Sequence, residues 1–143
     1  MKNNRKFNAL CLLVVLLGFL TACGSQTTPT PLEGATKEAI LAYSEPKTDS
    51  VMAGLKDNNY AEFSKDFDAD MLKALPQAKF DELKKTNDTN LGAYISRQVK
   101  SVIQQGDFYV VFYAVKFEKV DMSMRVIFRM DEPHQVSGLW FDK

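Results

Sequence analysis

The segment from Phe108 to Phe117 constrains the fold more than any other part of the chain, because nine of its ten residues are apolar. A strand with one face in water alternates apolar and polar residues. This segment does not alternate, so we expect a strand that is covered on both faces. Helices of the same chain would cover one face, and the cover of the other face bears directly on function.

Three further runs rich in β-branched and aromatic residues surround this segment, at about 93–104, 121–130 and 135–141. Short turns separate the runs, at Gln105-Gly106, Lys119-Val120 and Glu132-Pro133. Runs of this length joined by such turns predict an antiparallel meander.

Helical patterns precede the meander. A first helix is expected to begin at Ala35. Pro46 either ends this helix near Tyr43 or kinks it before it continues to Asp57, because the residue before a proline disfavours the helical region.

A second helical stretch is predicted over 60–75, in one or two pieces, from apolar residues at three- and four-residue spacing. Pro76 suits the first turn of another helix, and residues 86–90 are expected to form a loop. Helices that precede a single sheet indicate an α+β fold, with N-terminal helices packed on a curved four-stranded antiparallel meander.

The first 22 residues have the features of a secretory signal, a basic start followed by an apolar stretch over 7–20. This stretch is shorter than the roughly 20 residues that span a bilayer. It is followed by Leu20-Thr21-Ala22-Cys23, which resembles the lipobox of bacterial lipoproteins. The resemblance implies that residues 1–22 are removed and that Cys23 is lipidated, which would anchor the protein on the extracytoplasmic side of the cell membrane. An ordinary signal peptide with a chance cysteine is the alternative.

The remaining chain is expected to form one domain. Residues 23–34 would hold the lipidated cysteine and a polar tether, and residues 35–143 suffice for a single core. Loss of three basic residues with the signal leaves 15 of the 18 basic side chains against 18 acidic ones, a net charge of −3. This balance argues against a strongly basic surface for nucleic acid.

Strand register predicts which residues occupy the side of the sheet away from the helices, called the second face below. A two-residue turn at Lys119-Val120 would place Tyr113 opposite Val126 on the helix side. The second face would then carry Val110, Phe112, Arg125, Ile127, Arg129, Val136 and Trp140. Tryptophan and arginine around an apolar centre are typical of a protein interface, so we expect these residues to meet a partner. Cover by the tether, the C-terminal residues or strand curvature is the alternative.

The first hairpin is predicted to have a three-residue loop over 105–107. Such a loop would pair Val99 with Tyr113 and Ile95 with Phe117 on the helix side, and Gly106 would supply the positive φ that the loop requires.

Candidate catalytic and metal-binding groups are few. Asp66, Asp68 and Asp70 have the spacing of a calcium loop, but the glycine and the glutamate that such a loop needs are missing. His134 is the only histidine and lies in a predicted turn. No metal or cofactor is therefore predicted.

Three segments resemble a known family. They are the Asn-Tyr-x-x-Phe-Ser-Lys-Asp-Phe motif at 59–67, the strand end at 115–119 and the closing Gly-Leu-Trp-Phe at 138–141. Together with leading helices and a terminal sheet, they are similar to the nuclear transport factor 2-like cone, and more narrowly to an uncharacterised bacterial domain of that superfamily. The resemblance implies a fold and the possibility of dimerisation, and it supplies no catalytic residue.

We therefore expect a lipid-anchored, non-catalytic module that binds a protein, either a second copy or an envelope component. One alternative is a small apolar ligand in the pocket between helices and sheet. Another is a weak enzyme of the isomerase or hydrolase type, in which Tyr94, Tyr109 or Tyr113 would need an acid that the apolar runs do not contain.

Overall fold

The computed structural model describes residues 29–142, which fold into four helices and one sheet of four strands. The helices are α1 (Gly34–Asp57), α2 (Tyr60–Ser64), α3 (Ala69–Ala74) and α4 (Gln77–Asn90). The strands are β1 (Tyr94–Gln105), β2 (Phe108–Phe117), β3 (Asp121–Arg129) and β4 (Val136–Asp142). All neighbouring strands are antiparallel and their order follows the chain, so the predicted α+β meander is confirmed.

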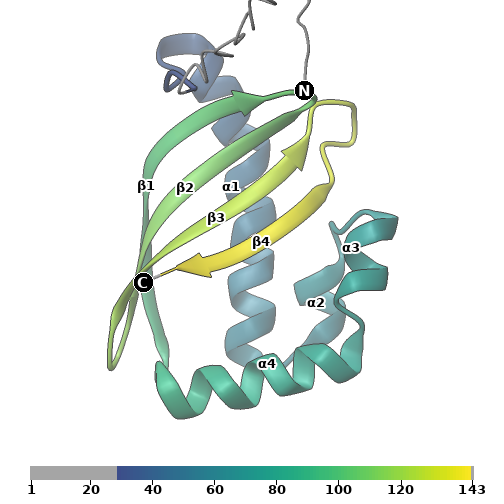
Figure 1. Cartoon of the computed structure of the whole chain (residues 1–143), viewed down its shortest axis with the longest axis vertical. Helices are drawn as coiled ribbons and strands as arrows, with labels where there is room; N and C mark the ends of the chain where they lie inside the picture. The colour runs from purple at the N-terminus through teal and green to yellow at the C-terminus, as the bar shows by residue number, and fades with distance from the viewer. Residues whose placement is uncertain (1–28, 143) are drawn as a thin grey trace, which may run out of the picture.

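The helices and the sheet form two layers (Figure 1). Helix α1 runs behind the sheet, and α4 lies across its lower end. Among the described residues no helix lies in front of the sheet. No helix in this part of the chain is both long enough and apolar enough to cross a membrane. The predicted signal, Cys23 and the beginning of the tether lie outside the described residues.

Helix α1 continues through Pro46 to Asp57, which decides between the two sequence alternatives. The proline removes one backbone donor, and its own carbonyl accepts a hydrogen bond from Ser50 Oγ at 3.1 Å. The helix ends at Asn58, whose left-handed conformation (φ 54°) is one that asparagine tolerates. The helix is held against the sheet by buried side chains, including Ile40 and Val51.

The stretch over 60–75 forms two short helices, each with a side-chain cap. Asn59 Oδ1 accepts from the backbone of Glu62 at 3.2 Å, and Asp68 Oδ1 accepts from the backbone of Met71 at 2.8 Å. These caps satisfy backbone donors at the helix starts that would otherwise lack partners. The sequence left open whether this stretch forms one helix or two, and the structure has two.

The loop predicted at 86–90 is wrong, because α4 continues to Asn90. Asparagine and threonine are weak helix formers in isolation. Here Asn87 is buried and its carbonyl accepts hydrogen bonds from Leu91 and Gly92. Tertiary packing at this end of the sheet outweighs the local preference.

The residues predicted to face the helices do so, although the predicted register of the second hairpin is wrong. Tyr113 pairs with Met124 and not with Val126, since the two residues of the turn are Glu118 and Lys119. A shift of two residues keeps every side chain on its face. Tyr113, Met124 and Val126 are all at most 1% exposed.

The predicted loop of the first hairpin is also wrong. Gln105 pairs with Phe108, which leaves a two-residue turn with Gly106 at a φ of 58°. Register shifts farther along β1 then restore the predicted pairing of Val99 with Tyr113. They bring Tyr94, and not Ile95, opposite Phe117.

The bulges of β1 divide its apolar residues between the two faces. Ile103 lies opposite Val110 on the second face, while Ile95 is 52% exposed. A bulge leaves one residue unpaired and bends its strand, which is consistent with the bent course of β1 in Figure 1.

Candidate functional site

The second face of the sheet has an apolar centre built from three strands. Val110 lies between Ile103 of β1 and Ile127 of β3. In the next row along the strands, Phe112 lies opposite Arg125, which pairs in turn with Trp140 of β4. Side chains two residues apart on one strand share a face, so these two rows form one continuous surface.

Six of the seven residues predicted for the second face lie on it. Val110 is almost fully buried, although it does not belong to the core cluster beneath the helices. Trp140 is 44% exposed. The other four are partly buried: Phe112, Arg125, Ile127 and Arg129.

Val136 is the exception, and this part of the register prediction is wrong. The predicted pairing holds from Asp142 to Gly138, but the register then shifts, because β4 carries one extra residue, Ser137, opposite the step from Ile127 to Phe128 of β3. The irregularity brings Val136 opposite Phe128, on the core side, where it is 0% exposed. Val136 also bridges to Phe67 at the junction of α2 and α3, so it belongs to the monomer core.

Trp140 is held flat on the second face by its neighbours. A side chain at Gly138 would meet the Trp140 ring, because a Cβ atom there would lie 2.1 Å from Cζ3. The guanidinium carbon of Arg125 lies 5.3 Å from the centroid of the Trp140 ring, which is a cation–π contact. The absence of a side chain at Gly138 is what allows the indole to lie there.

The charges of the second face are distributed along the strands. Arg129 lies toward one end of β3, where it pairs with Asp131 at 2.8 Å. Asp121 begins the same strand at the other end and pairs with Lys116 in the ladder. Between them, Arg125 Nε lies 3.6 Å from the carboxylate of Asp142. Arg129 therefore lies on one side of the apolar centre and Asp121 on the other.

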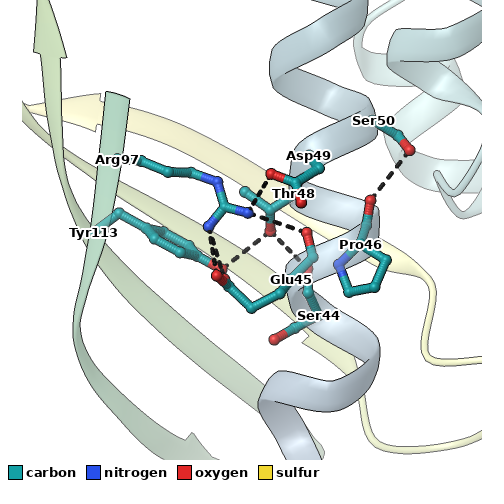
Figure 2. A network of polar contacts seen from close by, with 8 residues as sticks. All are labelled: Ser44, Glu45, Pro46, Thr48, Asp49, Ser50, Arg97 and Tyr113. Atoms are coloured by element: carbon teal, nitrogen blue, oxygen red, sulfur yellow. Dashed lines mark hydrogen bonds and ion pairs between the residues drawn. The ribbon is translucent and has the colours of Figure 1, made fainter. Parts of the chain in front are cut away.

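A second cluster of polar side chains joins α1 to the sheet (Figure 2). Arg97 Nη1 donates to both carboxylate oxygens of Glu45 at 2.8 Å, and its Nη2 donates to Asp49 at 2.6 Å. The Tyr113 hydroxyl donates to Glu45 Oε1 at 2.8 Å and lies 3.1 Å from Thr48 Oγ1. These contacts tie β1 and β2 to one face of the helix.

The residue types of this cluster also occur in catalytic sites, but their burial between helix and sheet indicates a structural role. The Tyr113 ring is 1% exposed and the Arg97 side chain 7% exposed. Burial raises the pKa of Tyr113 well above its ordinary value, and the nearby carboxylate of Glu45 acts in the same direction. A hydroxyl that is buried, neutral and bonded on both sides is suited to hold the fold together.

Sequence reasoning missed Glu45 and Arg97. One signal was available, because Arg97 shares the parity of Val99 and therefore falls on the helix side of β1. A buried guanidinium needs a carboxylate partner. The partner is 52 residues away, so the sequence does not indicate which acid it is.

The other candidate groups have structural roles. Asp66 pairs with Lys47 at 2.9 Å, and Asp68 caps α3 and accepts from Ser137 Oγ. Within residues 29–142 no group of three acidic, histidine or cysteine side chains is placed to hold a metal ion. His134 stacks on Tyr43 at 4.0 Å, and burial followed by the effect of Tyr109 raises the pKa of Tyr43 to about 12.

The fold and the second face together define a small α+β domain whose described helices all lie on one side of the sheet. The chain belongs to the family described as Protein of unknown function (DUF3887), whose model matches residues 48–139. Comparisons with curated proteins and with solved structures gave no match.

Proposed function

We propose that this protein is a membrane-anchored, extracytoplasmic lipoprotein that works by binding another protein, without catalysis, through the second face of its sheet. The lipid anchor would be Cys23, in the lipobox after the basic and apolar leader. The fold is proposed to be of the nuclear transport factor 2-like type, on the resemblance of its motifs and on the order of helices before a four-stranded meander.

The observation that carries the proposal is the composition of the second face, on which no helix of residues 29–142 packs. Ile103, Val110, Phe112 and Ile127 form its centre, and Trp140 is the most exposed large aromatic side chain among the described residues. Monomeric proteins rarely expose large contiguous apolar patches, and such patches mark interaction sites. Tryptophan and arginine are the residue types that most often carry binding energy.

The partner that this face fits is a second copy of the same chain. A two-fold axis running across the strands at the level of Phe112 would bring Arg129 of one copy toward Asp121 of the other. The apolar centres would then lie on one another, as in sheets that pack face to face. A surface that carries both charges around an apolar centre is self-complementary in this way.

Two adjacent residues of β2 provide the test, because they point to opposite faces. Phe112→Ser should reduce the mass of residues 24–143 in solution from dimer to monomer, measured by light scattering after size exclusion. The melting temperature of the monomer should change little on this substitution. Tyr113→Ser is the matched control, and it should destabilise the monomer by roughly 3–5 kcal/mol, as other large-to-small core changes do.

Two outcomes would contradict the proposal. If Phe112→Ser unfolds as readily as Tyr113→Ser, the second face belongs to the monomer core. If the unsubstituted domain remains monomeric at about millimolar concentration, the face does not bind a second copy.

A further inference from the structure

A separate hollow of about 400 Å³ lies between α4 and the strands β3 and β4. This size falls within the roughly 300–1,000 Å³ of small-molecule sites. Its wall is mostly apolar, and most of these side chains are only partly buried, so they present free apolar surface to the hollow. They are Leu75, Leu83, Leu91, Met122, Leu139 and Phe141.

One polar side chain in this wall lacks a hydrogen-bond partner. Asn87 is 8% exposed, and its Nδ2 is buried with no acceptor within reach. A buried amide donor without an acceptor is destabilising, so such groups are rare. Helix α4 fixes the residue in place through the hydrogen bond from the backbone of Leu91 to the Asn87 carbonyl at 2.7 Å. An oxygen acceptor that reached this nitrogen from the hollow would satisfy the amide.

The surroundings of Asn87 favour a negatively charged acceptor. Asn87 also borders a neighbouring hollow of about 250 Å³ that is lined by three lysines and two acids. Both acids are engaged, because Asp88 pairs with Lys84 and Glu118 accepts from the backbone of Ala93 at 3.0 Å. Three lysines against two acids leave a formal net charge of +1 beside the amide.

We propose that the hollow between α4 and the sheet, called the α4 groove below, binds a small amphipathic carboxylate. The hydrocarbon chain would lie against the apolar wall, and the carboxylate would accept a hydrogen bond from Asn87 Nδ2. A charge-assisted bond of this kind is stronger than a neutral one. This inference does not depend on self-association, since the six apolar residues listed above lie on the helix side of the sheet, and Trp140 alone borders both the groove and the second face.

The protein contains its own probe for this site. Trp140 is the only tryptophan of the chain and borders the α4 groove. Decanoate added to the full chain below its micelle concentration should produce a saturable change in tryptophan fluorescence. Decylamine, which has the same kind of chain but a cationic head without an acceptor, should give none. Absence of saturation with decanoate, or an equal response to decylamine, would overturn the proposal.

Substitutions test the contributions of the amide and of the apolar wall to binding separately. Asn87→Leu keeps the shape of the side chain and removes the unpaired donor, so the fold should be retained while the affinity for decanoate falls about tenfold. Leu83→Ala should weaken binding of decanoate by a similar factor. Leu72→Ala is the matched control, because Leu72 is 42% exposed on α3 and does not border the groove. Unchanged affinity in Asn87→Leu, or equal losses in the two leucine variants, would contradict the assignment.

Discussion

At the scale of single residues, Tyr113 connects burial to pH dependence. Burial raises the pKa of Tyr113 in the folded protein, whereas the unfolded chain releases the phenol proton near the ordinary value of about 10. The stability that this group contributes is therefore complete below about pH 10 and is lost progressively as the pH rises above it.

Tyr113→Phe should accordingly make stability less sensitive to alkaline pH. Between about pH 8 and pH 11, the free energy of unfolding of the unsubstituted protein should include a loss of about 1.4 kcal/mol from this one group. The variant should lack that part of the loss, as measured by urea unfolding at the two pH values. Equal losses in both proteins would show that Tyr113 titrates normally.

Gly138 provides a second test at this scale, because its hydrogen atom leaves room for the Trp140 ring. Gly138→Ala should displace the indole from the second face and weaken self-association about tenfold or more, which light scattering across a concentration series would measure. The tryptophan emission should change in parallel. If association is unaffected, Trp140 is not an anchor of the proposed interface.

At the scale of elements, the guanidinium of Arg97 adds a buried ion pair to the apolar contact between α1 and the sheet. Arg97→Met should lower the free energy of unfolding by about 3 kcal/mol, because removal of one partner leaves the carboxylate of Glu45 beside a buried phenol. The surface pair of Lys65 and Glu62 has the same 2.8 Å separation but is exposed, so Lys65→Met should change stability little. Similar effects of the two substitutions in chemical denaturation would refute this ranking.

The elements also show how far the sequence predicts the structure. Period-two patterning identified the strands and the face of nearly every residue in β2 and β3, and it survived a register error of two residues because that error preserves parity. It failed at Val136, where a single bulge reverses parity. The α4 groove and the Arg97 cluster could not be predicted, since they join side chains from distant segments whose spacing depends on how the helices pack.

At the scale of the whole molecule, the proposed anchoring to the membrane rests on Cys23. Cys23→Ser should prevent lipidation, so that the protein moves from the detergent phase to the aqueous phase in Triton X-114 partitioning, or accumulates as an uncleaved precursor. Cys11→Ser is the control within the leader and should partition like the unsubstituted protein. A Cys23→Ser variant that is processed and partitions without change would refute the lipoprotein assignment.

The bridge between Val136 and Phe67 would affect the order in which the chain folds if it is exported as proposed. Each strand pairs with the strand that is next to it in the chain, so short loops connect the paired strands. Local connections of this kind favour rapid folding. The last strand, however, completes the junction of the first helices, where Val136 accepts from the backbone of Asp68 and donates to that of Asp66. If the chain is threaded out N-terminus first, its helices emerge long before β4 and expose their apolar sides until translocation is complete. During that interval the nascent protein would depend on chaperones or on the membrane surface to avoid proteolysis and aggregation.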